Sequence, residues 1–183
     1  MYPLVRLVKS LVGASRRSRL GPFDESVVRF RVWPGDLDTN RHLNNGRYLT
    51  LMDLGRWDLT GRTGLLREAV RRRWMPVVVA ATMRFRRPLG FLQGFELRTR
   101  LLGWDETSFY IAQSFHSNGK VCAEGAVRAM MLDGRRKVPP QEVMELVQSD
   151  VRSPELPAWV LRWEDAMRGQ TAAEAAPAGA VLR

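Results

Sequence analysis

The chain has 183 residues, of which 45% are hydrophobic and 9% aromatic, so it can bury the core of one domain and carry terminal extensions. The formal net charge of +10 is compatible with nucleic acid, anionic lipid or acidic ligands as partners, and it does not distinguish among them. The sequence has no zinc-finger spacing, no RNA-recognition signature and no aromatic stripe among its basic residues, so we expect a solvated basic surface and no nucleic-acid partner.

Residues that bind metals or form disulfides are scarce. The single Cys122 excludes an intramolecular disulfide and a cysteine-rich metal site, which fits a reducing compartment, and we expect it to be a small core residue. His42 and His116 are too few for a histidine-rich zinc centre. We therefore predict no metal and no redox cofactor, and a cytoplasmic protein that can associate with membranes.

The N-terminal segment is basic and amphipathic. From Met1 to Ala14, apolar residues recur at roughly helical spacing, and Arg6 and Lys9 interrupt them. This segment is too short and too charged to span a bilayer, and the two cations break the apolar region that a signal peptide needs. We expect residues 1–22 to form an extension, with peripheral contact between residues 1–19 and an anionic membrane as a hypothesis.

A strand and a long helix are predicted next. Val27 to Trp33 alternates in period two, as a half-buried strand does, and Pro34-Gly35 ends it. After a polar loop, apolar residues recur every three or four positions from a start near Leu43 to Asn45 until about Thr60, where Gly61 and Gly64 supply stop signals. A shorter helix follows over Leu65 to Trp74.

The remainder is predicted to be mostly strand. Pro76 to Ala81 is a continuous apolar run, typical of a central strand covered on both faces, and Pro88 closes its continuation. Asn118-Gly119 is a strong hairpin signal between two later strands. The three later strands are Phe95 to Leu102, Ser108 to His116 and Val121 to Leu132. Short helices are expected at Pro139 to Leu146 and Pro157 to Arg168, before a flexible tail of residues 169–183.

This order of elements predicts an α+β domain over residues 23–168, in which a curled antiparallel sheet wraps one long central helix. Such a sheet leaves one face and one edge to be covered. Because the run from Pro76 to Ala81 is so apolar, we expect a second copy of the chain to supply that cover in a two-fold dimer.

The most informative stretch is the polar loop from Gly35 to Tyr48, which combines acid, amide and imidazole groups directly ahead of the long helix. The unpaired N–H groups and the positive dipole end of that helix would point back at Asp38, Asn40 and His42. That geometry suits an anionic or polarised carbonyl oxygen.

The segment Asp36-Leu-Asp-Thr-Asn-Arg-His-Leu-Asn-Asn-Gly-Arg-Tyr48, with the order of elements, resembles the hotdog-fold thioesterases, in particular the 4-hydroxybenzoyl-CoA thioesterase family and its plant acyl-carrier-protein relatives. Two further segments, Phe95 to Asp105 and Ser153 to Pro157, resemble the branch known as thioesterase superfamily member six and its bacterial relatives. The similarity covers about Val27 to Trp163. It implies a hotdog fold, hydrolysis of acyl-CoA or acyl-carrier-protein thioesters, and a homodimer or a dimer of dimers.

The resemblance also implies roles for individual residues. The second aspartate of the family loop falls on Asp38, the carboxylate that attacks the thioester or activates water. Asn40 and His42 match the amide and imidazole that position substrate and water in the plant relatives, and the backbone N–H that stabilises the oxyanion falls on Asn45. Thioester hydrolysis needs such a base or nucleophile and such a donor, whatever the family.

Several residues keep a structural interpretation open. Asp36 and Asn44 are natural turn and helix-cap residues. For Asp38, capping of the helix is the alternative to a catalytic role. For His42, a hydrogen bond to a loop carbonyl is an equal alternative to a role in the site. The plant relatives carry a glutamate where this chain has Pro88, so their four-residue mechanism cannot operate here.

Three residues are candidates for binding the substrate. Arg41 replaces the glycine that is usual in bacterial relatives and, like Arg86, could contact a phosphate of coenzyme A. Tyr48 is the third candidate, although packing of its ring is the simpler interpretation. The alternative to an enzyme is a non-catalytic acyl-binding or membrane-associated hotdog protein, in which the loop is structural.

Overall fold

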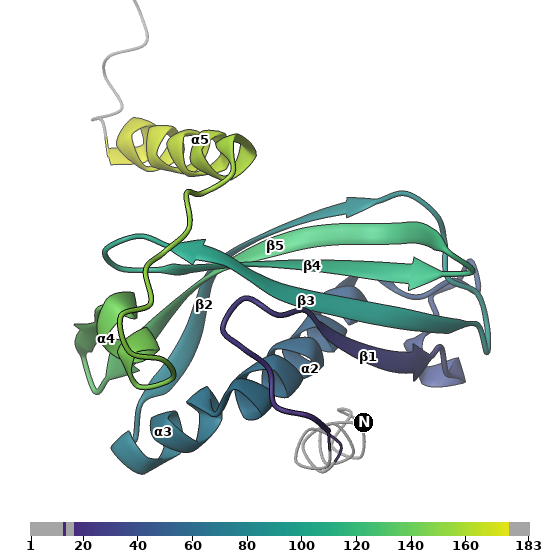
Figure 1. The fold of residues 1–183 in the computed structure, drawn as a ribbon. Helices are drawn as coiled ribbons and strands as arrows, with labels where there is room; N and C mark the ends of the chain where they lie inside the picture. The colour runs from purple at the N-terminus through teal and green to yellow at the C-terminus, as the bar shows by residue number, and fades with distance from the viewer. Residues whose placement is uncertain (1–12, 14–16, 176–183) are drawn as a thin grey trace, which may run out of the picture.

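The computed structural model describes residue 13 and residues 17–175, and it shows a curled sheet with one long helix in its hollow (Figure 1). The amphipathic segment from Met1 to Ala14 lies, apart from Gly13, outside the described residues. The elements in chain order are β1 (Ser26–Arg31), the 3-10 helix η1 (Pro34–Asp36), α2 (Asn45–Thr63), α3 (Leu65–Arg72), β2 (Met75–Phe85), β3 (Gly94–Trp104), β4 (Phe109–Ser117), β5 (Lys120–Asp133), β6 (Arg136–Val138), α4 (Pro140–Glu145) and α5 (Ala158–Ala175).

The central helix α2 begins and ends through local chemistry. The side chain of Asn44 caps it by accepting a hydrogen bond from the Gly46 N–H group at 2.9 Å. Gly61 stays helical, and the helix ends only at Gly64, whose φ of 85° is in the left-handed region that favours glycine. Of the two predicted stop signals, the second is therefore the one that acts.

The buried face of α2 packs into the concave side of the sheet. Leu51, Met52 and Leu54 are almost fully buried there, and each contributes about 1.5–3 kcal/mol through burial. Gly55 marks the closest approach, because a Cβ atom at this position would collide with the Thr99 hydroxyl and the Leu97 side chain. The absence of a side chain at Gly55 therefore lets the helix lie directly on the sheet.

The sheet has the strand order β1-β3-β4-β5-β2, with antiparallel neighbours throughout. Strands β3, β4 and β5 form the predicted meander, and Asn118 and Gly119 adopt φ values of 49° and 72° in the tight turn that this pair predicts. The short strand β6, which was not predicted, pairs with the end of β5.

The prediction that Pro76 to Ala81 is a central strand covered on both faces is wrong. Among the described strands, β2 pairs with β5 alone and forms an edge of the sheet, where Met75 is 64% exposed and Val78, Val79 and Phe85 are each more than 40% exposed. Its register shifts between Val78 and Ala80, as at a β-bulge. An apolar run indicates that a strand will be buried, but it does not indicate whether the same chain or another one buries it.

The two C-terminal helices lie on different sides of the sheet. α4 closes one end of the hollow, where Val143 and Met144 pack with Trp104 and Phe109 in a second core cluster. α5 lies on the outer face, opposite α2 (Figure 1), and an ion pair of 3.0 Å joins Glu164 to Arg128 on β5.

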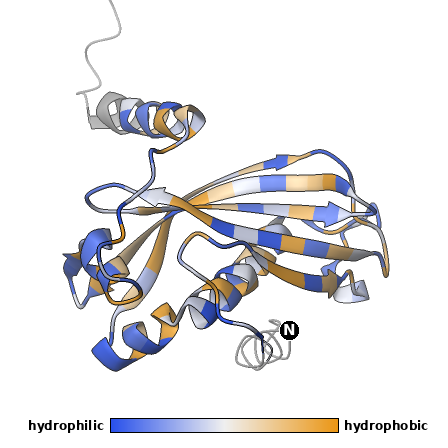
Figure 2. Cartoon of the chain, viewed as in Figure 1, coloured by the Kyte–Doolittle hydropathy of each residue, from blue (hydrophilic) through white to orange (hydrophobic). Residues whose placement is uncertain are grey.

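The predicted end of the last helix at Arg168 is too early, because α5 continues to Ala175 and takes in the start of the predicted tail. Its added residues include alanine, glutamine and glutamate, which favour helix. Figure 2 shows the hydropathy along the ribbon, with hydrophobic and hydrophilic residues alternating along β1 and β3, as strands with one buried face require.

Three further observations bear on function. Cys122 is buried, and that burial raises the pKa of its thiol, as expected of a core residue. Among the described residues, no group of three or more histidine, cysteine, aspartate or glutamate side chains could hold a metal ion. Within the same part of the chain, no helix combines the length and the apolar character needed to cross a bilayer.

Candidate active site

The loop between β1 and α2 folds back on itself and brings its polar residues to the start of the helix. Leu37 and Leu43 form an antiparallel bridge, and the Asp38 N–H group donates to the His42 carbonyl at 2.8 Å. Arg41 turns the chain with a φ of 60°. This backbone conformation explains why a glycine suits the position, since it costs a residue with a side chain about 1–3 kcal/mol.

The half-buried Asp38 carboxylate is oriented by this turn. Its Oδ1 atom accepts hydrogen bonds from the N–H groups of Asn40, at 2.8 Å, and His42, at 3.1 Å. Its Oδ2 atom accepts no hydrogen bond from any described residue. One oxygen therefore holds the turn and the other is left for chemistry, so the capping and catalytic interpretations of Asp38 are compatible.

The first turn of α2 supplies a backbone donor next to this loop. Asn44 accepts from Gly46 through its side chain, and its own N–H group donates to the Asp36 carbonyl at 2.9 Å. The Asn45 N–H group, first in the helix, has no acceptor among the described residues. Asp36 is a turn residue, because its Oδ2 atom accepts from the Trp33 N–H group at 2.9 Å.

Asn40 and His42 contact the Asp38 carboxylate through their backbone N–H groups and not through their side chains. Both side chains are exposed, and neither makes a side-chain hydrogen bond to another described residue. The backbone of His42 also bridges to Gly90, and the Leu89 carbonyl accepts from the Leu43 N–H group at 2.8 Å. The segment that follows Pro88 thus braces the loop, at the place where the plant relatives carry their glutamate.

Tyr48 is a core residue that borders the site. Its ring is 2% exposed and packs edge-on against Phe85 and Phe115, with centroid distances of 5.1 and 4.8 Å. Burial, with smaller contributions from Cys122 and the charge of Asp38, raises the pKa of Tyr48 to about 12. Its phenol therefore stays protonated at neutral pH, and its ring joins α2 to the exposed edge strand near Asp38.

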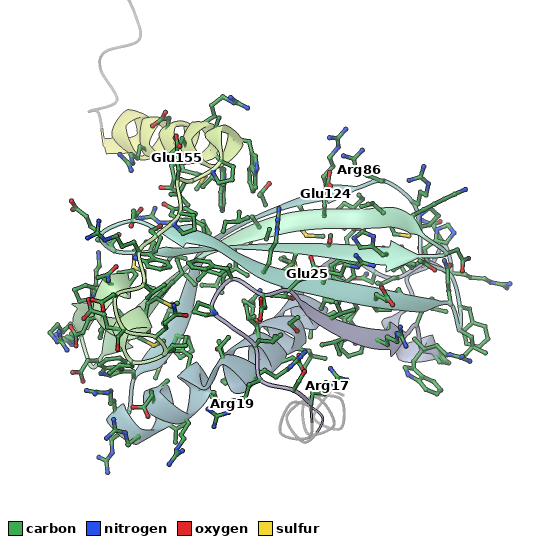
Figure 3. All side chains as sticks on the ribbon, in the orientation of Figure 1. Arg17, Arg19, Glu25, Arg86, Glu124 and Glu155 are labelled. Carbon is green, nitrogen blue, oxygen red and sulfur yellow. The ribbon has the colours of Figure 1, made fainter. Side chains whose placement is uncertain are left out.

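The two arginines predicted to bind substrate lie apart. Arg41 is exposed within the loop itself. Arg86 donates through Nε to Glu124 at 2.9 Å, and Figure 3 shows both of these side chains on the outer face of the sheet, away from α2. The structure brings Arg41, but not the Arg86 guanidinium, to the Asp38 loop.

Sequence reasoning missed a second group of residues on α2. Arg56 forms an ion pair with Asp53 and donates to the Gln113 side chain at 2.7 Å, and Gln113 in turn donates to the Met52 carbonyl at 2.9 Å. Asp53 and Arg56 border an apolar cavity of about 170 Å³. The signal in the sequence was the pair of opposite charges, Asp53 and Arg56, three positions apart on the helix, but this pair said nothing of the cavity.

A curled antiparallel sheet around one central helix, with a polar loop at the helix start, defines a hotdog fold. A family model described as the thioesterase-like superfamily matches residues 32–163. The chain therefore belongs to the thioesterase-like superfamily. Both the predicted fold and the predicted family are thus confirmed.

Relatives and solved structures agree with this assignment. Protein THEM6 of Danio rerio is 38% identical over 142 residues, covering 76% of this chain and 68% of that protein, and Protein THEM6 of Xenopus laevis is 34% identical over 135 residues, covering 72% and 63%. The chain thus spans about two thirds of the length of these relatives.

Among solved structures, the probable thioesterase YbaW of Escherichia coli matches with a TM-score of 0.62 at 20% identity, over 67% of this chain and 96% of that one. A gentisyl-coenzyme A thioesterase matches with a TM-score of 0.59 at 23% identity, over 68% of this chain and all of that one. At these identities the two structures establish the shared fold.

Proposed function

We propose that the protein hydrolyses acyl thioesters, with acyl-CoA or an acyl-carrier protein as its substrate and Asp38 as the reacting carboxylate. The observation that carries this proposal is the divided role of Asp38, whose Oδ1 atom is held by two backbone N–H groups while Oδ2 accepts no hydrogen bond from a described residue. Membership of the thioesterase-like superfamily and the likeness to a coenzyme A thioesterase support a thioester as the substrate.

Two routes are open to Asp38. As a general base, Oδ2 takes a proton from water, the hydroxide adds to the carbonyl carbon, and the tetrahedral intermediate releases the thiolate as the C–S bond breaks. As a nucleophile, Oδ2 adds to the same carbon and expels the thiolate, and water then hydrolyses the mixed anhydride. Both routes place negative charge on the carbonyl oxygen, so both need a donor.

The Asn45 N–H group is the proposed donor to that oxyanion. It lies at the positive end of the α2 dipole and is not committed to another described residue, so it needs no reorganisation when the charge develops. The proposal gives Asn40 and His42 a positioning role, which their backbone hydrogen bonds to Asp38 support. The exposed Arg41 is proposed to meet the anionic part of the substrate.

We also propose that the protein acts as a homodimer joined through β2, or as a dimer of such dimers. The outer edge of β2 pairs with no described strand, and it carries four large apolar side chains that are more than 40% exposed. An unprotected apolar edge of this kind invites pairing with another strand. A two-fold axis through β2 would extend the sheet continuously across two copies.

The test is hydrolysis of a panel of acyl-CoAs and acyl-carrier proteins, with release of the free thiol measured for wild type, Asp38→Asn and Asp165→Asn. We expect turnover by wild type and by Asp165→Asn, whose substitution lies on exposed α5, and a large loss in Asp38→Asn. Equal turnover by wild type and Asp38→Asn would remove Asp38 from the mechanism.

The alternative function is a non-catalytic acyl-binding or membrane-associated hotdog protein. One observation favours it: the exposed side chains of Asn40 and His42 make no hydrogen bond to another described residue, as expected if the loop is structural. The same panel separates the two functions. Acyl-CoA binding in equilibrium dialysis without turnover of any thioester would favour the alternative.

A further inference from the structure

The outer face of the sheet, opposite α2, carries a second and more polar cavity, which we call the outer basin. It has a volume of about 630 Å³ and lies between strands β2 to β5 and the start of α5 (Figure 1). The side chains in its wall that can recognise a ligand are Arg84, Arg98, Arg100, His116, Glu124 and Trp159. The volume is typical of small-molecule sites, which hold about 300–1,000 Å³.

The register of the strands gives the basin a flat floor. Arg100 on β3 is paired with Ala112 on β4, which in turn is paired with Ala126 on β5. Thr82 on β2 completes this row. Between Arg100 and the edge strand the floor thus carries only small side chains, over about 14 Å or three strand spacings. A ligand can therefore approach the sheet closely.

The next row of the sheet places cations on both sides of this floor. Arg98 on β3 is paired with Ser114, and Ser114 is paired with Glu124 on β5. Arg84 on β2 ends the row beside Glu124. Strand β3 thus brings Arg98 and Arg100 to one side of the basin, and β2 brings Arg84 to the other.

Two of these arginines keep their charge for a ligand. Arg100 is exposed and has no hydrogen bond or ion pair with another described residue. The Arg84 side chain is 70% exposed, and its Nη1 atom lies 4.0 Å from Glu124 Oε1. That oxygen already accepts a hydrogen bond of 2.9 Å from Nε of Arg86, which lies beside Glu124 on the outer face (Figure 3).

The acids around the basin are matched by other arginines. They form three ion pairs, which join Glu25 to Arg98, Glu96 to Arg29 and Glu124 to Arg86. The positive charges of Arg84 and Arg100 are in excess of these pairs. Guanidinium groups bind anions with several oxygen atoms through paired hydrogen bonds, so a phosphate group suits this excess charge.

Helix α5 adds an aromatic side chain to the basin. Trp159 lies in the first turn of the helix, lines the basin and is 42% exposed. Its neighbour Val160 is fully buried against Leu102 and Tyr110 in a third core cluster, so the start of the helix is fixed on the sheet. An indole ring held in this way offers a surface on which a nucleobase can stack.

We propose that the outer basin binds a nucleoside monophosphate, with its phosphate at Arg84 and Arg100 and its base on the indole of Trp159. The core residues of α2 pack on the opposite face of the same strands, so the sheet separates this ligand from the helix that carries the proposed chemistry. The inference goes beyond the proposed function and does not depend on it.

The first test measures AMP binding by isothermal titration calorimetry. We expect saturable binding by wild type and a loss of affinity of about tenfold or more in Arg100→Ala and in Trp159→Leu, because each variant removes one recognised part of the ligand. Arg135→Ala is the matched control, since it removes one positive charge from an exposed turn outside the basin and should bind like wild type. Both basin variants change exposed side chains, so their urea unfolding should match wild type. No AMP binding by wild type, or equal affinity in all four proteins, would overturn the proposal.

The second test divides the ligand into its parts. Adenosine lacks the phosphate and ribose 5-phosphate lacks the base, so each should bind wild type at least about tenfold more weakly than AMP. Inorganic phosphate that binds as tightly as AMP would reduce the basin to an anion site and overturn the role of Trp159. Vesicles of anionic phospholipid that bind wild type but not Arg100→Ala, without any AMP binding, would assign this face to a membrane and overturn the proposal.

The third test separates a free nucleotide from the nucleotide part of coenzyme A. Because the basin lies across the sheet from α2, KM for acyl-CoA should be unchanged in Arg100→Ala and Trp159→Leu. A KM that rises in parallel with the Kd for AMP would assign the basin to the substrate and overturn a separate site. If no thioester is hydrolysed, the proposed function fails, whereas the calorimetry still decides whether the basin binds a nucleotide.

Discussion

Two turns of this protein use an aspartate in the same way and then diverge. In the loop before α2, Asp38 holds the turn with Oδ1 alone. In the turn between β3 and β4, Oδ1 of Asp105 accepts from the N–H groups of Thr107 and Ser108 at 2.7 and 2.8 Å. Its Oδ2 atom also accepts from the Tyr110 hydroxyl at 2.7 Å, so both oxygens are occupied.

The difference separates a structural carboxylate from a reactive one. Burial by itself would raise the pKa of Asp105, but the hydrogen bonds from Thr107, Tyr110 and Ser108 outweigh it and lower the pKa. A carboxylate bonded at both oxygens has nothing left for a substrate. Asp38 lies at the start of a helix, and its Oδ2 atom accepts no hydrogen bond from a described residue. A residue that only forms a turn does not need such a second, unbonded oxygen.

The largest expected effect is on rate. Asp38→Asn should lower kcat by about 10² to 10⁴, the range for a lost acid–base group, because the amide cannot accept a proton or attack the carbonyl. Its stability should stay close to wild type, since the amide oxygen can still accept from the Asn40 and His42 N–H groups. Turnover kinetics and urea unfolding measure the two effects, and a large loss of stability would make Asp38 structural like Asp105.

The next effect tests the helix amide. Asn45→Pro should lower kcat by about 10² to 10³, because it removes the proposed oxyanion donor. Proline suits the first helical position, and Asn44 already has the extended φ and ψ of −58° and 137° that precede a proline. Asn45→Ala keeps the N–H group, so the ratio of the two rates isolates the amide. A ratio near one would remove the amide from the mechanism.

The third effect is on stability. Asp105→Ala should cost about 1–2 kcal/mol, the lower part of the range for hydrogen bonds to a partly exposed charge, and leave kcat unchanged. Because the folded-state pKa of Asp105 is lowered, its contribution is full above the unfolded-state pKa of about 4 and is lost as pH falls through the folded value. Unfolding at neutral and acid pH should show the difference from wild type shrinking in acid. A constant difference would contradict the charged role.

The smallest effect concerns the shape of the first turn. Arg41→Gly removes the strain of a side chain at a left-handed φ. It should raise the free energy of unfolding by about 0.5–1 kcal/mol, after the extra entropy of glycine in the unfolded chain is subtracted. Arg73→Gly is the matched control, since its φ is 59° and it lies outside the loop. KM for acyl-CoA should rise a few-fold in the first variant only. An equal rise in both would mean that Arg41 does not meet the substrate.

Local patterns predicted much of the fold. The central helix, the meander and the turn at Asn118-Gly119 depend on residue spacing and backbone preference, which act over a few positions. The caps formed by Asp36 and Asn44 were predicted for the same reason. The candidate site was predicted as a set of neighbours in one loop, with Asp38 foremost.

The sequence by itself therefore determined the elements, the family and the residues that meet at the start of α2, because their contacts are local. Only the tertiary structure decided that Pro76 to Ala81 forms an exposed edge and that Arg86 pairs with Glu124. It also decided that α4 closes a cavity far from Asp38. These features depend on which distant segments share a surface, and residue spacing along one segment carries no record of that.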